Sequence, residues 1–207
     1  MDILITAGAT RNPIDAMRYI SANSSGQTGV WIAEQLHPLA AVHLMGSPEA
    51  LLRCRIDCER TVYSSTSDLL SKMQAWVTSH PDGVVVHASA VGDYMAAEPT
   101  TTEKIESGVA ELTLRLVPTP KIVDQIHSWS PSATLISFKA APPQTGPDAL
   151  LTIAEAQRSR TNSRCVFANV IGDLNRQLLV LGPDGPTWYD SRPLAMAALV
   201  TSILALS

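Results

Sequence analysis

The chain has 207 residues, of which 45% are hydrophobic and 16% are charged, enough to bury one substantial core in a single large domain. This composition excludes disordered, collagen-like and low-complexity proteins. Lys and Arg number 15 against 19 Asp and Glu, so the net charge is −4. Because such a chain lacks the basic face that tracks a phosphate backbone, nucleic acid is not an expected partner.

The most apolar stretch, residues 194–206, is shorter than the roughly 20 residues that span a bilayer, so it is predicted to be a packed helix. No basic region or cleavage site precedes the first apolar segment, residues 1–6, which favours a cytoplasmic protein without membrane contact. Cys54 and Cys58 have a spacing that could place both on one helix face. Since no further ligand pair completes a zinc site, they are interpreted as ordinary thiols.

Short apolar strands alternate with helical periods along much of the chain. The predicted strands are residues 3–6, 42–45, 61–63, 84–87, 112–117, 134–138 and 165–168. The predicted helices between them are residues 30–36, 69–77, 120–129 and 148–158. This alternation is typical of an α/β protein with a Rossmann-like, doubly wound, mostly parallel sheet and helices on both faces.

The pattern changes after Asn169. Residues 177–181 and 187–189, joined by the turn 182–185, predict an antiparallel hairpin, and a last helix follows Pro193. With no internal repeat, residues 1–207 are predicted to form one domain. The long unpatterned stretch at about 92–111 is predicted to be a lid or binding loop.

The first strand-to-helix connection indicates a nucleotide site. It reads Thr6-Ala7-Gly8-Ala9-Thr10, and Ser24-Ser25-Gly26 precedes the following helix. Small residues at the carboxyl end of a strand let backbone N–H groups approach phosphate, and the helix N-terminus adds a favourable dipole. The spacing fits neither a Walker A loop nor a regular GxGxxG. A structural tight turn explains the glycines alone equally well.

Two later segments offer polar groups for the same site. Asp93 follows the strand at 84–87, where it could hold a ribose, bind a metal or cap a helix. Lys104 lies in the long loop and is either a solvated surface lysine or a mobile cation on a lid. As a lid cation it would meet the charge that develops when an oxyanion attacks the α-phosphorus of a nucleotide.

Six segments together resemble phosphopantothenoylcysteine synthetases, the phosphopantothenate–cysteine ligases of coenzyme A biosynthesis. In chain order they are Thr6–Thr10 with Pro13-Ile14-Asp15, Arg18–Ser21 with Ser24-Ser25-Gly26, Ala90–Tyr94, Lys104-Ile105, Thr119–Ile122 and Phe167-Ala168-Asn169. The match covers nearly the whole chain, and the length is that expected of the stand-alone bacterial form. The resemblance implies a homodimeric enzyme that activates 4'-phosphopantothenate with CTP and Mg²⁺ and then transfers the acyl group from an acyl-cytidylate to cysteine.

The resemblance also implies individual functions. Lys104 would assist acyl-cytidylate formation, Arg18 would reach the phosphate of phosphopantothenate, and Asn169 would also bind substrate. The nucleotide would be held by Gly8, Ser89, Asp93, Lys104, Pro120, Lys121, Ile122, Val123, Phe138 and Arg160. The backbone of residues 120–123 would read the base, so the sequence leaves CTP or ATP open.

Some family positions differ here. The asparagine that holds the acyl-cytidylate for attack is replaced by Ala22, and Asn23 follows one residue later as the expected catalytic substitute. Gln157 and Thr161 stand where the family has a pair of lysines, and Arg160 is the expected replacement. Arg164 replaces a customary aspartate, and the lid lacks the frequent lysines after Ile105.

These differences keep two alternatives open. One is a divergent enzyme that uses the same chemistry on another carboxylate or amine. The other is a non-catalytic nucleotide-binding module, favoured by Ala22. A short-chain NAD(P)-dependent oxidoreductase is disfavoured, because none of the four tyrosines has a lysine four residues later to lower its pKa.

Overall fold

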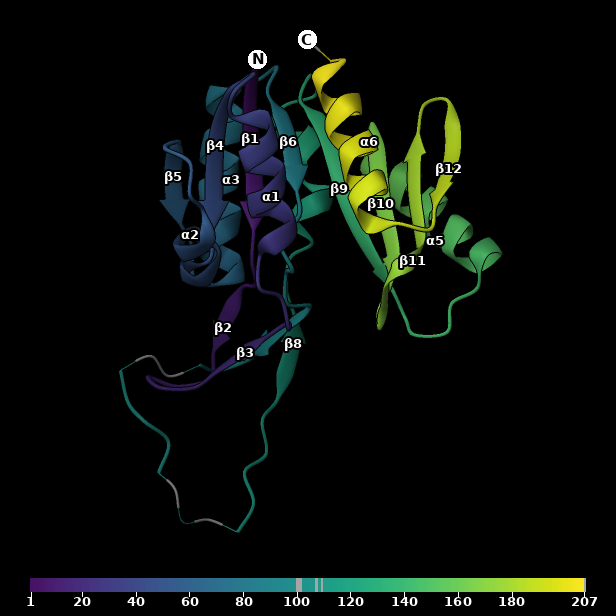
Figure 1. Ribbon diagram of the computed structural model, residues 1–207. Coiled ribbons are helices and arrows are strands. Elements are labelled where there is room, and N and C mark those ends of the chain that lie inside the picture. Colours follow the sequence, from purple (N-terminus) through teal and green to yellow (C-terminus); the bar gives the residue numbers. More distant parts are fainter. Residues whose placement is uncertain (100–101, 107, 109, 207) are drawn as a thin grey trace.

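One central sheet organises the protein in the computed structural model, which describes all residues except 100, 101, 107, 109 and 207. Its strand order is β12-β11-β10-β9-β6-β1-β4-β5 (Figure 1). The strands are β1 (Asp2–Ala7), β4 (Ala41–Gly46), β5 (Glu59–Val62), β6 (Val84–His87), β9 (Thr134–Ala141), β10 (Cys165–Val170), β11 (Asp173–Gly182) and β12 (Gly185–Tyr189). All pairs are parallel except β10–β11 and β11–β12. The Rossmann-like prediction with a C-terminal hairpin is thus confirmed.

The strand order reverses at β1. Ile3 pairs with Val42 of β4 on one side and with Val84 of β6 on the other. β5 continues outward from β4, whereas β9 and β10 continue outward from β6. In open α/β sheets ligands bind at such a reversal, beyond the carboxyl ends of the strands. The fold therefore points to the ends of β1 and β6 as the site.

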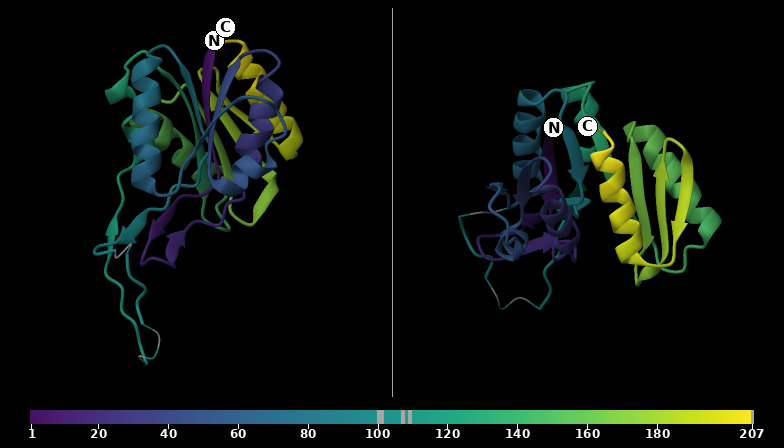
Figure 2. Two further views of the ribbon diagram at one scale, coloured as in Figure 1. Left: turned by 90° about the vertical axis from the view of Figure 1, so that its left-hand side faces the viewer. Right: turned by 45° about the horizontal axis from the view of Figure 1, so that its top comes forward.

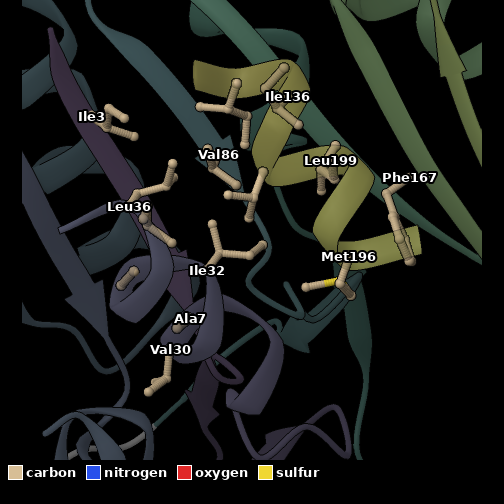
Figure 3. Packing of buried hydrophobic residues seen from close by; sticks show 14 of the residues in the cluster. Ile3, Ala7, Val30, Ile32, Leu36, Val86, Ile136, Phe167, Met196 and Leu199 are labelled. Carbon is tan, nitrogen blue, oxygen red and sulfur yellow. The ribbon is translucent and has the colours of Figure 1, made fainter. Parts of the chain in front are cut away.

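Helices cover both faces of the sheet (Figure 2). Ile3 and Ile5 of β1 pack in one cluster with α1 (Gln27–Leu36) and α6 (Arg192–Leu204), as Figure 3 shows for Ile32 and Leu199. Leu4 faces the other way, into a cluster with α3 (Thr66–Ser79) and α4 (Ile126–Trp129). The next strands on that face are covered by α5 (Pro147–Thr161). Burial of both faces explains why β1 is apolar at successive positions.

Two short antiparallel pairs lie beyond the carboxyl end of the sheet (Figure 1). One joins β2 (Arg11–Pro13) to β3 (Tyr19–Ser21), and the other joins β7 (Tyr94–Ala96) to β8 (Leu116–Pro118). The predicted strand at 112–117 is therefore wrong in extent and place. Its apolar residues alternate with polar ones, a pattern that fits a half-exposed ribbon rather than a sheet buried on both faces.

The lid segment was predicted as a loop throughout, but β7 occupies part of it. The described residues between β7 and β8 contain no helix or strand, and Figure 1 shows this segment projecting away from the sheet. The helix predicted at 120–129 is divided into the 3-10 helix η1 (Ile122–Asp124) and α4.

The shared helix face proposed for two cysteines is also wrong. The short helix α2 (Pro48–Arg53) ends before Cys54, whose backbone is extended, and Cys58 lies in the connection to β5. Cys54, Cys58 and Cys165 are free thiols. No helix in the described part of the chain is long and apolar enough to cross a membrane.

Candidate nucleotide and substrate site

A glycine pair brings the end of β1 against the start of α1. Gly8 has a φ of 94° and Gly26, the N-cap of α1, has a φ of 77°, both in the left-handed region that favours glycine. A Cβ on Gly8 would lie 2.2 Å from Ser47 Oγ, and one on Gly26 would lie 3.0 Å from Gly8 N. The close approach requires glycine at both positions. It sets the helix N-terminus beside the turn, where a phosphate is favoured.

A buried hydrogen-bond chain joins the ends of β1 and β6. The Tyr63 hydroxyl lies 2.8 Å from both the Ala7 carbonyl oxygen and Ser89 Oγ. The Ser89 backbone N–H donates to Thr6 Oγ1 at 3.1 Å, and that hydroxyl is hydrogen bonded to His87 Nδ1 at 2.9 Å. Burial lowers the pKa of His87 to about 4 and raises the pKa of Tyr63, so both side chains are neutral near pH 7.

The two strand ends continue to pair beyond the sheet. Ala90 N donates to Gly8 O at 2.8 Å, and Thr10 N donates to Ala90 O at 3.1 Å. Gly92 N then donates to Thr10 Oγ1 at 2.9 Å. The structure thus brings together the first glycine turn and the segment that carries Ser89, which are far apart in the sequence.

Asp93 lies beside the segment expected to read the base. Its carboxylate forms an exposed ion pair with Lys121, and its carbonyl oxygen accepts a hydrogen bond from Thr119 N at 2.9 Å. Pro120 is exposed, whereas Ile122 is 1% exposed and packs in the cluster under α3. Ile122 is thus buried as a whole residue, whereas Pro120 and Lys121 are the exposed part of this segment.

The remaining expected nucleotide residues lie on β9, η1 and α5. Phe138 is half-buried and its ring stacks on Phe167, with centroids 5.2 Å apart. Val123 is half-buried, and Arg160 of α5 pairs with Asp124 of η1. Asn169 is buried in β10, where its amide donates to Val170 O at 3.4 Å.

Gln157 and Thr161 are structural residues in this chain. Gln157 is buried and donates to Ser137 Oγ at 2.9 Å and to Phe138 O at 3.1 Å. Thr161 donates to Gln157 O at 2.7 Å. The bonds of Gln157 fasten α5 to β9, and the cations next in sequence to the two expected lysine positions are Arg158 and Arg160.

A buried carboxylate that the sequence analysis assigned no function holds Arg18. The side chain of Asp15 is fully buried and accepts hydrogen bonds from Arg18 Nε at 2.9 Å and from Ile105 N at 3.0 Å. Arg18 also donates to Ile105 O at 2.7 Å. Lys104, next to Ile105, is exposed. The only sequence signal for Asp15 was its place in the motif with Pro13 and Ile14.

Ala22 and Asn23 lie between β3 and α1, on the segment that leads to Gly26. Ala22 is half-buried and Asn23 is exposed. Asn23 is therefore an accessible residue on the segment before Gly26, and its catalytic function stays a prediction. Within the described residues, no group of three His, Cys, Asp or Glu side chains is arranged to hold a metal ion.

Residues 1–180 match the family described as the DNA/pantothenate metabolism flavoprotein C-terminal domain, abbreviated DFP. The chain belongs to the DFP family. A DFP relative, the coenzyme A biosynthesis bifunctional protein CoaBC of Thermococcus kodakarensis, is 32% identical over 191 residues, covering 88% of this chain and 45% of the relative. The CoaBC of Escherichia coli is 33% identical over 129 residues, covering 59% of this chain and 30% of the relative. The chain spans less than half the length of these relatives.

Solved DFP structures share the whole fold. The DNA/pantothenate metabolism flavoprotein of Streptococcus pneumoniae superposes with a TM-score of 0.88 at 25% identity, covering 100% of both chains. A Cab2 mutant in complex with phosphopantothenate-cysteine superposes with a TM-score of 0.78 at 18% identity, covering 99% of this chain and 86% of that one. At that identity the second likeness shows the fold alone.

Proposed function

We propose that this DFP protein is a ligase that joins 4'-phosphopantothenate and L-cysteine through an acyl-cytidylate, at the expense of CTP. The observation that carries the proposal is the meeting of Gly8, Gly26 and Ser89 at the reversal of strand order, beside Asp93 and Lys121. The CoaBC relatives, named as coenzyme A biosynthesis proteins, support the same chemistry. CTP is proposed because the family that the chain resembles uses it, and residues 120–123 leave ATP as the alternative nucleotide.

The first step makes the carboxylate reactive. A carboxylate acylates an amine only after one of its oxygens becomes part of a good leaving group. Attack of that oxygen on the α-phosphorus breaks the bond to pyrophosphate and forms the mixed anhydride. The Gly8 turn and the N-terminus of α1 bind phosphate oxygens, and Lys104 stabilises the negative charge that develops at the α-phosphate. Arg18 binds the phosphate of phosphopantothenate.

Magnesium fits this arrangement as a partner of the nucleotide. A Mg²⁺ ion bound by phosphates takes only one or two protein carboxylates, so a three-residue cluster is unnecessary. Asp93 supplies an exposed carboxylate at this edge of the sheet, with Lys121 as its present partner. When bound, the ion neutralises charge on the triphosphate.

The second step transfers the acyl group to the amine. The cysteine nitrogen attacks the acyl carbon, the bond to CMP breaks, and the ammonium proton leaves to solvent. Asn23 is proposed to hold the acyl-cytidylate, since its side chain is accessible on the segment before Gly26. A homodimer, with Arg18 near the interface, and a cytoplasmic location complete the proposal.

Pyrophosphate release from CTP, with ATP in parallel, tests the proposal in the presence of Mg²⁺ and 4'-phosphopantothenate, with and without cysteine. Release with CMP and a cysteine adduct is the expected result. Release without an adduct would restrict the activity to acyl activation and favour another amine, as Ala22 suggests. Absence of release with either nucleotide would favour the non-catalytic module.

A further inference from the structure

The buried carboxylate of Asp15 accepts five hydrogen bonds in the turn after β2. Oδ1 accepts from Met17 N at 2.9 Å and from Arg18 N at 2.7 Å. Oδ2 accepts from Arg18 Nε and Nη2 and from Ile105 N. The Arg18 guanidinium and these backbone N–H groups hold the pKa of Asp15 well below its ordinary value, despite burial. The turn thus contains a charge that stays ionised across the neutral range.

The same carboxylate fastens the lid on one side of Lys104. Ile105 N donates to Asp15, while Ile105 O accepts from Arg18 at 2.7 Å. On the other side of Lys104, Glu103 O accepts from Ala16 N at 3.0 Å. The backbone is therefore tied down immediately before and after Lys104, whereas the lysine side chain is exposed.

The hydrogen bonds of the Arg18 side chain run from Nε and Nη2, and within the described part of the chain none runs from Nη1. Nη1 is thus the atom with which Arg18 can meet an anion. One carboxylate orients this guanidinium and fixes the segment that carries Lys104. In the proposed ligase, Arg18 binds the phosphate of phosphopantothenate and Lys104 meets the charge that develops at the α-phosphate.

We propose that Asp15 is a positioning residue that anchors the lid and thereby places Lys104 for the first step, an inference that rests on the proposed ligase function. A charge-assisted hydrogen bond from a backbone N–H is stronger than a neutral one, so ionised Asp15 limits the movement of Ile105. An unanchored lid would have to be ordered in every turnover, at a cost in conformational entropy. The bonds to Asp15 order the backbone around Lys104 in advance. A misplaced catalytic group of this kind costs about 100-fold in rate.

Four variants separate the anchor from its surroundings. Asp15→Asn removes the charge, and Ile105→Pro removes the N–H that donates to Asp15 while also restricting the backbone of residues 104 and 105. Ile105→Ala keeps that N–H and serves as the matched control for loss of the side chain. Asp68→Asn is the control for loss of a carboxylate, because Asp68 bonds to Ser64 and Lys72 in α3, away from the lid.

The first measurement needs no activity. Hydrogen exchange of the Ile105 and Ala16 backbone amides, which donate to Asp15 and Glu103, is expected to be at least about tenfold faster in Asp15→Asn than in wild type, and equal to wild type in Asp68→Asn. Ile105→Pro lacks one of these amides, so its readout is faster exchange at Ala16, which donates to Glu103. Thermal unfolding checks that each variant is folded. Equal protection in Asp15→Asn and wild type would overturn the inference, whether or not the protein has ligase activity.

The second measurement follows single-turnover pyrophosphate release. Ile105→Pro is expected to lower the rate about 10- to 100-fold while leaving the KM for phosphopantothenate unchanged, and Asp15→Asn is expected also to raise that KM because Arg18 loses its support. Ile105→Ala should change the rate less than threefold.

A double variant tests whether Asp15 acts through Lys104. In a Lys104→Gln background, Asp15→Asn should add little further loss in rate, because the charge that Asp15 is proposed to position is already absent. Full additivity of the two losses would contradict an effect exerted through Lys104. Failure of wild type to release pyrophosphate would refute the proposed function, while hydrogen exchange would still test the anchor.

Discussion

The hydroxyl groups of Tyr63 and Ser89 lie 2.8 Å apart, and the direction of their hydrogen bond is determined. Tyr63 has a single hydroxyl hydrogen, which it donates to the Ala7 carbonyl oxygen. Ser89 must therefore donate to Tyr63. The Ser89 backbone N–H is also used, in its bond to Thr6. Since both hydrogens of Ser89 are already donated, its hydroxyl offers only lone pairs to the site. The Ser89 hydroxyl can therefore accept a hydrogen bond from a ribose hydroxyl or a bound water, but it has no hydrogen left to donate to a phosphate.

Tyr63→Phe tests this network. The variant loses a buried hydrogen-bonding group, while Ala7 O keeps its bond from Ser47 N at 2.9 Å, so the free energy of unfolding should fall by about 1 kcal/mol.

Ser89→Ala should weaken nucleotide binding up to about tenfold and affect stability less. Urea unfolding and calorimetric titration with CTP measure the two effects. Tyr19→Phe, at an exposed tyrosine whose ring lies under Arg11, is the control. Equal stabilities of the Tyr63→Phe and Tyr19→Phe variants would refute the argument.

Gly29→Ala should detach α1 from β1. A Cβ at this position would lie 2.7 Å from Thr6 O and 2.7 Å from Ala7 Cβ, so the helix must shift away from the strand. Overpacking of this kind costs about 1 to 3 kcal/mol, which outweighs the gain of up to about 1 kcal/mol from the helix propensity of alanine. Urea unfolding measures the loss, and CTP affinity should fall with it. Gly146→Ala, where nothing lies within 4 Å, should be neutral or stabilising.

The lowered pKa of buried His87 predicts that the free energy of unfolding falls on mild acidification. Its folded pKa is about 4 against an ordinary 6.5, so the unfolded chain binds the proton first as the pH falls. The contribution of His87 is complete above pH 6.5 and is lost progressively toward pH 4, amounting to about 3 kcal/mol. His43, whose pKa is also lowered by burial, acts in the same direction.

Urea unfolding at pH 7, 5.5 and 4.5 tests the prediction. His87→Gln should show a shallower loss over this range than wild type, and the slope that remains comes from His43 and, near pH 4.5, from Glu49, whose pKa is lowered from 4.5. Identical slopes for the two proteins would show that His87 does not control the transition. Asp15 does not interfere, because its lowered pKa affects stability only below its ordinary value of 3.8.

Lys104→Gln should slow pyrophosphate release while leaving CTP affinity largely intact. The substitution removes a charge that acts in the transition state, and the turn at Gly8 and α1 remains to bind the nucleotide. A loss of about 100-fold or more in single-turnover rate is the expected size. Unchanged turnover would remove the lid lysine from the mechanism.

Asn23→Ala should accumulate acyl-cytidylate. If Asn23 holds the intermediate for attack by the amine, its loss slows only the second step, and quenched-flow samples should contain more intermediate than wild type. Ser25→Ala, at an exposed neighbour on the same segment, controls for a change in the loop itself. Normal amide formation in the Asn23 variant would assign this function to another group.

Much of the sheet could be predicted because its residues carry strong local patterns. The run Ile3-Leu4-Ile5 is buried on both sides and only a central parallel strand accommodates it, and the glycine turn at its end placed the site at β1. The turn at 182–185 likewise predicted the hairpin of β11 and β12. These features depend on a few neighbouring residues.

The remainder depends on contacts between distant residues. β2 and β7 are three residues each, too short to show a period. The alternation at 112–117 was read as a sheet strand, because nothing in that segment tells an exposed ribbon from a half-buried edge. The bond from Ile105 to Asp15 spans 90 positions, so no local pattern could show that the carboxylate anchors the lid.

Both chain ends lie at the amino end of the sheet, opposite the glycine turn. Figures 1 and 2 show the start of β1 and the end of α6 side by side in every view. A second folded domain attached to either end would therefore leave the opposite end of the sheet, with Gly8 and Ser89, uncovered. A short linker joining the two ends would give a circular chain that can be cut at a surface connection such as the β11–β12 turn, a rearrangement that would not disturb the bonds around Gly8, Ser89 and Asp15.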